Sequence, residues 1–275
     1  MASEAHRLWQ KDAGETTALP GVKARQEFIQ GIELTTIEIM NEEGSRALQK
    51  PQGTYFCFHL PSSLHRRDES FRPAVELLSS LIRRCLPLHA ENVLIAALGN
   101  PDVTPDALGP LCAEHVLITR HLKGNSLFQD YHATALARTG VLGTTGMESA
   151  FQIRALCQAL SPDCVLAVDA LAGADPEDLC QSIQICDAGI APGSGVGNDR
   201  EALDRSSLGI PVIAIGVPTV IDASSLSGEA GLGSLFVTPR YIDSSVRQLA
   251  RLIGYGINLA LQPELSLADL ELLLE

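Results

Sequence analysis

The stretch VLIAALGNPDVTPDALGP, at residues 93–110, decides the fold that this sequence predicts. It opens with five consecutive apolar residues before Leu98, a run typical of a parallel strand that is buried on both faces. A Gly-Asn pair then ends the strand, and the tripeptide Thr-Pro-Asp that finishes at Asp106 predicts a helix start. The stretch therefore places polar groups at the carboxyl edge of a sheet, where open α/β folds bind their ligands.

A second predicted strand carries one ionisable residue near its carboxyl end. The segment CVLAVDAL, at residues 164–171, is apolar apart from Asp169. A buried carboxylate costs free energy unless it is paired or hydrogen-bonded, so it is seldom present for packing alone. We therefore predict that Asp106 and Asp169 meet at neighbouring strand ends as a catalytic pair. A carboxylate that only complements a helix dipole is the alternative interpretation of Asp106.

The two carboxyl groups are expected to differ in pKa. At a helix start, free amides and the positive end of the helix dipole would lower the pKa of Asp106. Burial in an apolar strand would raise the pKa of Asp169. Carboxyls with pKa values pushed apart can serve as general base and general acid. Pro110 cannot donate to the carbonyl of Asp106, so the helix either bends or begins near residues 108–109.

Strand and helix patterns alternate from residue 92 onward. The predicted strands cover 93–98, 132–138, 164–170, 184–190 and 211–217, and the predicted helices lie within 105–122 and at 147–160, 176–183, 241–260 and 265–274. Such alternation indicates right-handed crossovers. The predicted fold class is therefore α/β, with a mainly parallel, doubly wound sheet flanked by helices.

The N-terminal part of the chain predicts an extension of this sheet. Residues 31–40 and 53–60 are rich in β-branched and aromatic residues and read as two strands, and an amphipathic helix is predicted at 72–86. Residues 1–30 form a polar segment with a helical turn near residues 4–11. Because no linker signal divides the chain, we expect one α/β domain over residues 1–275.

Composition narrows the classes of function. The chain has 275 residues, 45% of them hydrophobic and 19% charged, and a net charge of −13 without a basic cluster. This argues against direct binding to nucleic acid or to an anionic membrane, and no apolar run reaches the length of a membrane span. The seven cysteines are odd in number and form no CxxC pair, which favours reduced thiols over zinc ligands. We expect a cytoplasmic protein that acts on a protein or a small molecule.

A second group of residues is predicted to bind substrate. Gly143 and Gly146 would let a substrate backbone approach, and Thr144 and Thr145 would hydrogen-bond to it. Glu148 lies in the first turn of the following helix, where it either binds substrate or complements the dipole. The run GSGVG, at residues 193–197, lacks the last glycine of a nucleotide-binding fingerprint and is interpreted as a turn that lines the cleft.

Seven motifs in matching order resemble the germination protease family of spore-forming bacteria. They are GNPDVTPDALGP, ITRHL, GTTGMES, VLAVDALA, DAGIAPGSGVGNDR, LGIPVIAIGVPTVIDA and FVTPRYID, between about residues 30 and 262. The resemblance implies a phosphorylase/hydrolase-like fold and places the family's two essential aspartates on Asp106 and Asp169. No cofactor is indicated.

The resemblance also implies a function. Such a protein would be an aspartic-type endopeptidase of the spore core that starts the degradation of small acid-soluble spore proteins at germination, cutting after glutamate and before an apolar residue. The family is made as a zymogen and forms a homotetramer, so a homo-oligomer is expected here. No recognisable pro-segment precedes Ala5-His6, so either this sequence begins near the mature end or its activation differs.

Two alternatives from other classes stay open at this stage. The fold is similar to that of hydrogenase maturation endopeptidases, in which the two corresponding acids and a histidine hold nickel. His115, His121 and His132 read as helix-surface or strand-end residues, so none of them matches that ligand, and a metal-dependent peptidase is the first alternative. The second alternative is a non-catalytic binding protein on the same scaffold.

Overall fold

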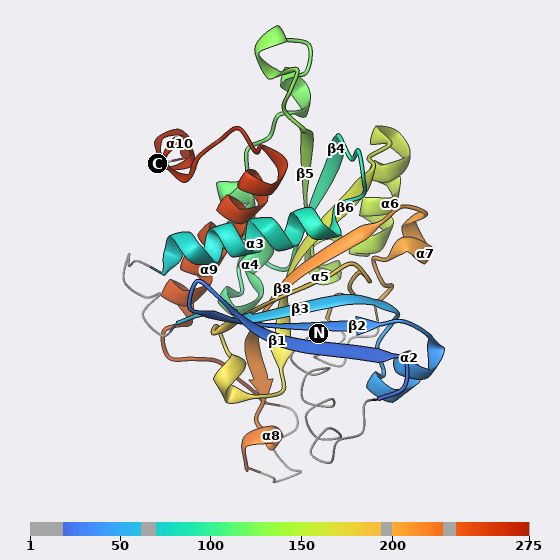
Figure 1. Cartoon of the computed structure of the whole chain (residues 1–275), viewed down its shortest axis with the longest axis vertical. Coiled ribbons are helices and arrows are strands. Elements are labelled where there is room, and N and C mark those ends of the chain that lie inside the picture. Colours follow the sequence, from blue (N-terminus) through green and yellow to red (C-terminus); the bar gives the residue numbers. More distant parts are fainter. Residues whose placement is uncertain (1–18, 62–69, 194–199, 228–234, 275) are drawn as a thin grey trace.

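The computed structural model describes residues 19–61, 70–193, 200–227 and 235–274. These residues form a mixed sheet of nine strands with helices packed against both of its faces (Figure 1). The strand order is β1-β2-β3-β7-β8-β6-β4-β5, and β9 pairs with β8 outside this path. The α/β class is therefore confirmed, whereas the helical turn predicted near residues 4–11 lies outside the described residues.

One half of the sheet is parallel. It consists of β8 (Val212–Asp222), β6 (Cys164–Gly173), β4 (Asn92–Leu98) and β5 (Ala133–Gly140). The apolar run of β4 is buried from Val93 to Leu98, as its sequence predicted. In the pairing of β4 with β6, the last partners are Ala97 and Val168. The strand β4 therefore ends beside the point where β6 presents Asp169.

The other half of the sheet is antiparallel. It consists of β1 (Val22–Ile29), β2 (Ile32–Ile39), β3 (Gly53–His59) and β7 (Ser182–Cys186), and the short β9 (Phe236–Val237) also runs antiparallel to β8. The predicted extension at residues 31–60 is confirmed as β2 and β3, and β1 adds a strand within the segment 1–30. A mainly parallel, doubly wound sheet is not confirmed, because only the half built by β8, β6, β4 and β5 is parallel.

The direction of β7 has a local cause. The helix predicted at residues 176–183 is wrong: a single 3₁₀ turn, η6 (Pro176–Asp178), begins where Asp175 accepts a hydrogen bond from the amide of Glu177. The chain then enters β7, whose Ile183 and Ile185 are fully buried. Parallel strands need a long crossover connection, and this short link instead lets β7 pair antiparallel to β8.

Helices cover both faces of the sheet. The first face carries α3 (Phe71–Cys85), α4 (Leu108–Cys112), α9 (Ile242–Leu261) and α10 (Leu267–Leu274), and the second carries α2 (Glu42–Leu48), α6 (Ser149–Leu160) and α7 (Arg205–Leu208). Along the chain, the short helix α5 (Leu142–Thr145) lies between β5 and α6, and the short helix α8 (Ser224–Ser227) lies between β8 and β9. Within the described residues, no helix is both long enough and apolar enough to cross a bilayer.

The helix predicted within residues 105–122 is broken into short turns. Only α4 and three 3₁₀ turns form there, namely η2 (Thr104–Asp106), η3 (Ala113–His115) and η4 (Arg120–Leu122). Asn258 of α9 donates to the carbonyl of His115 over 2.8 Å and accepts from the amide of Leu117 over 2.9 Å. These side-chain bonds take the place of helical ones, so a contact distant in sequence ends the helix. The start near residues 108–109 is confirmed by α4.

Candidate active site

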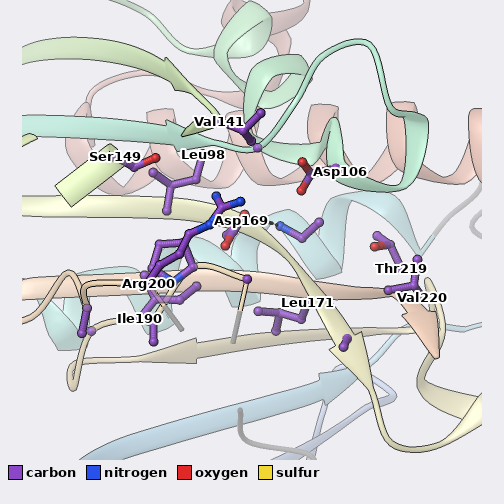
Figure 2. A pocket seen from close by; sticks show the side chains of 18 of the residues that line it. Leu98, Asp106, Val141, Ser149, Asp169, Leu171, Ile190, Arg200, Thr219 and Val220 are labelled. Atoms are coloured by element: carbon purple, nitrogen blue, oxygen red, sulfur yellow. Dashed lines mark hydrogen bonds between the residues drawn. The ribbon is translucent and has the colours of Figure 1, made fainter. Parts of the chain in front are cut away.

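The carboxyl ends of β4, β6 and β8 border a cleft of about 630 Å³. Asp169 lies on its wall at the point where β6 passes the end of β4, and only 4% of its surface is exposed. The amide of Ala170 donates to Oδ1 of Asp169 over 3.0 Å. Leu98, Leu171, Ile190 and Val220 add apolar lining (Figure 2). The carboxyl of Asp169 is thus held in a largely apolar wall, as the sequence predicted.

Asp106 reaches the same cleft from the turn η2. The amide of Asn100 donates to its Oδ2 over 2.8 Å, which fixes one carboxylate oxygen to the end of β4. This close approach requires glycine at position 99, where φ is +106° and an added Cβ would lie 2.0 Å from the carbonyl oxygen of Asp106. The Gly-Asn pair of the motif therefore holds the aspartate six residues further along the chain.

Other elements hold η2 from both sides. Thr104 donates from its hydroxyl to Oδ1 of Asp243 in α9 over 3.0 Å, and Thr219 of β8 donates to the carbonyl of Pro105 over 2.7 Å. Gly109 lets α4 settle on the sheet, because a Cβ there would lie 2.2 Å from the carbonyl oxygen of Leu98. The position of Asp106 is therefore set by β4, β8 and α9 together.

The two carboxyls differ in burial and in pKa. Burial and the neighbouring charge of Asp106 raise the pKa of Asp169 to about 8. Burial also raises the pKa of Asp106, against the smaller opposing effect of the hydrogen bond from Asn100. The prediction of a lowered pKa for Asp106 is therefore wrong, because a 3₁₀ turn with a half-buried carboxyl replaces the exposed helix start on which it rested. Asp106 is still the more acidic member, since it is less buried and accepts the Asn100 amide.

Arg200, which was not predicted as a site residue, lines the same cleft. Its positive charge acts against the rise that burial causes in the pKa of Asp106 and of Asp169. Figure 2 shows the Arg200 side chain extending toward Asp169. The signal that could have found it is a single arginine at the end of the glycine-rich motif that finishes at residue 200. Of the turn predicted at residues 193–197, Gly193 is described and lines the cleft, whereas residues 194–197 lie outside the described residues.

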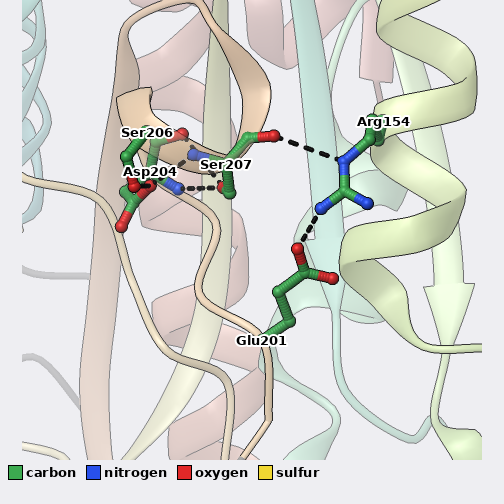
Figure 3. Close-up of polar contacts among 5 residues, drawn as sticks. All are labelled: Arg154, Glu201, Asp204, Ser206 and Ser207. Atoms are coloured by element: carbon green, nitrogen blue, oxygen red, sulfur yellow. Dashed lines mark hydrogen bonds and ion pairs between the residues drawn. The ribbon is translucent and has the colours of Figure 1, made fainter.

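The segment that follows Arg200 is tied to α6. Arg154 of α6 forms an ion pair with Glu201 and donates to the carbonyl of Ser207 over 3.2 Å (Figure 3). Asp204 caps α7 by accepting from the amide of Ser207 over 2.8 Å. These contacts hold the chain on the carboxyl side of Arg200 against a helix of the second face.

The predicted substrate-binding residues lie beside the cleft. Gly143, Thr144, Thr145 and Gly146 are exposed, and Val141 and Ser149, which flank them, line the cleft. Both threonine hydroxyls donate to the carbonyl of Val141, so they shape the turn of α5. The role of these four residues in substrate binding stays a prediction.

Glu148 precedes α6 as its N-cap residue and is half-buried. Its side chain makes no cap hydrogen bond, and Glu148 lies one residue before the first turn of the helix in which it was predicted. Whether it binds substrate stays a prediction. Among the residues that the structure describes, no group of three or more His, Cys, Asp or Glu side chains is placed to hold a metal ion.

Comparisons with known proteins point to one family. A family model described as germination protease matches residues 2–232. The germination protease of Caldanaerobacter subterraneus subsp. tengcongensis is 35% identical over 100% of this chain and 97% of its own length. That of Clostridium tetani is 34% identical over 98% of this chain and 97% of its own. That of Bacillus cytotoxicus is 38% identical over 83% of this chain and 64% of its own.

Proposed function

The chain belongs to the germination protease family and is thus a peptidase, and we propose that it is an aspartic-type endopeptidase in which Asp106 and Asp169 activate water. The observation that carries the proposal is the placement of two carboxyls of unequal burial in one cleft. Titratable pairs whose environments separate their pKa values mark acid and base roles. No protein nucleophile is needed in this scheme.

The proposed roles follow from the two environments. Near neutral pH Asp169 keeps its proton, because its pKa is about 8. Asp106, the more acidic carboxyl, would accept a proton from the water as that water attacks the peptide carbonyl. Asp169 would then give its proton to the leaving amine. Arg200 would favour the negative charge that develops in the cleft during the attack.

The proposed substrates are small acid-soluble spore proteins, cut after glutamate and before an apolar residue. The cation of Arg200 suits a glutamate side chain, since arginine pairs well with carboxylates. Val103 and Phe236 line the cleft, are 47% and 42% exposed, and suit an apolar side chain. Gly143, Thr144, Thr145, Gly146 and Glu148 are proposed to hold the substrate further out. Synthesis as a zymogen, assembly as a homotetramer and location in the spore core stay proposals as well.

Digestion of a purified small acid-soluble spore protein tests this function. We expect the protein to cut it, with fragments whose masses place each cut after glutamate and before an apolar residue. The same digestion in the presence of a chelator should proceed at the same rate, since both proposed catalytic groups are carboxyls of the chain.

Three results would contradict the proposal in different parts. Absence of cleavage would contradict the endopeptidase function. Cuts after residues other than glutamate would contradict the specificity alone. Loss of activity in chelator, restored by adding a divalent metal, would favour the metal-dependent alternative.

A further inference from the structure

The strand β6 continues beyond the strand that flanks it. Its pairing with β4 ends at Val168, whereas its pairing with β8 continues to Gly173. Beside residues 164–168, one side of β6 is occupied by β4. Among the residues that the structure describes, no strand pairs with residues 170–173 on that side. These four residues are half-buried, and all but Gly173 line the cleft. The sheet thus has a short open edge directly after Asp169.

The main chain of Ala170 points to this open side. The amide of Val165 donates to Pro211 at the start of β8, and main-chain groups alternate between the two sides of a strand. Residues 167 and 169 therefore face β8, and residues 168 and 170 face the side of β4. The Ala170 amide already donates to Oδ1 of Asp169 over 3.0 Å, so the groups that this edge offers to a peptide are the Ala170 carbonyl and, by the same alternation, the main-chain groups of Ala172.

An open strand edge inside a cleft is a template for an extended peptide. Unpaired main-chain groups on a sheet edge accept another strand, and several peptide-binding domains hold their ligands in this way. Four residues of strand span about 13 Å, so the edge offers main-chain bonds to a peptide of about four residues. Because the edge begins at Asp169, a peptide bound there would lie with its backbone beside that carboxyl.

We propose that a segment of the protein substrate binds as an added strand on the edge of β6 formed by residues 170–173, next to Asp169. The inference rests on the proposed endopeptidase function and adds the way in which the substrate is held. Main-chain pairing positions the peptide without reading its sequence, and the cleft side chains then select for residues on either side of the cut bond. Pairing also requires the cleaved segment to be extended, so folded substrates would be poor ones.

Ester substitution in a peptide substrate tests this inference with the wild-type protein. A peptide of about ten residues is made around a bond that the protein cuts in its protein substrate, and each amide other than the cut one is replaced in turn by an ester. The ester removes one N–H donor with almost no change in shape. We expect kcat/KM to fall about tenfold at every second position on one side of the cut bond, and less than about twofold at the positions between.

The pattern of losses separates the outcomes. Alternating losses confined to about four residues on one side support the added strand. Cleavage of every ester peptide within about twofold of the parent peptide would overturn it and leave the proposed function intact. If neither the protein substrate nor the parent peptide is cut, the proposed function fails, and the docking mode fails with it.

Discussion

Asp169 is an acidic residue at the end of an apolar strand. The residue is 4% exposed, and burial together with the charge of Asp106 raises its pKa to about 8. This residue could be predicted from the sequence because one acid interrupts an apolar run. Arg200 stands in the sequence only as a single arginine at the end of a glycine-rich motif, and its position on the cleft wall is a tertiary contact. The predicted direction for the pKa of Asp106 is wrong, because that direction depends on burial by β8 and α9.

The raised pKa of Asp169 predicts a pH-dependent stability. An unfolded aspartate has a pKa of about 3.9, so between about pH 4 and pH 8 the folded protein holds a proton that the unfolded chain releases. The free energy of unfolding contributed by this group therefore falls as the pH rises through that window. Asp169→Asn does not titrate and should be more stable than the wild type at pH 8, by on the order of a few kcal/mol. The difference should vanish near pH 4.

Urea denaturation of both proteins at several pH values measures this effect. Asp102→Asn is the matched control, because Asp102 is exposed and lies in the loop that carries Asp106. The control should follow the wild-type dependence on pH. If the free energies of unfolding of Asp169→Asn and of the wild type change with pH in the same way, the pKa of Asp169 is not raised by folding. The basis for its role as a general acid would then be removed.

At the scale of elements, Gly109 links α4 to the two central strands. A Cβ at this position would lie 2.2 Å from the carbonyl oxygen of Leu98 and 2.7 Å from that of Val168. Gly109→Ala should therefore push α4 and the adjacent η2 away from the sheet, at a cost of about 1–3 kcal/mol in stability. Because Asp106 moves with η2, kcat should fall by more than the loss of folded protein explains.

The control for this variant is Gly124→Ala. An added Cβ at Gly124 meets no atom within 4 Å, so its stability and kcat should stay near those of the wild type. If Gly109→Ala keeps wild-type kcat while folded, the position of Asp106 does not depend on the packing of α4.

Some elements could be predicted and others could not, for physical reasons. β4 and α9 have strong apolar patterns and are close to their predicted bounds. The helix within residues 105–122 fails because Asn258 takes main-chain groups that a helix would use. The helix at 176–183 fails because Ile183 and Ile185 are needed inside the sheet. Tertiary contacts of this kind leave no local pattern in the sequence.

At the scale of the whole molecule, the cleft depends on segments far apart in the chain. Asp106 comes from the turn η2 that follows β4, Asp169 from β6, Arg200 from the segment before α7, and Phe236 from the short antiparallel β9. The antiparallel half of the sheet also contributes Tyr55 of β3 to the cleft lining. The order of motifs could predict the family, and the strand patterns could predict that Asp106 and Asp169 meet, whereas the contributions of Arg200, Phe236 and Tyr55 to the cleft could be seen only in the folded protein.

Asp106 and Asp169 are proposed to act as one catalytic unit, and this claim predicts the kcat of the two single variants and of the double variant. Asp106→Asn and Asp169→Asn should each lower kcat at least about a hundredfold while folding stays intact, because either change removes a proton-transfer step. The double variant should be no slower than the slower single variant, since removal of either member already disables the pair. Asp102→Asn should keep wild-type kcat. The claim would be contradicted if either single variant kept a tenth or more of the wild-type kcat. It would also be contradicted if the loss of kcat in the double variant equalled the product of the losses in the two single variants.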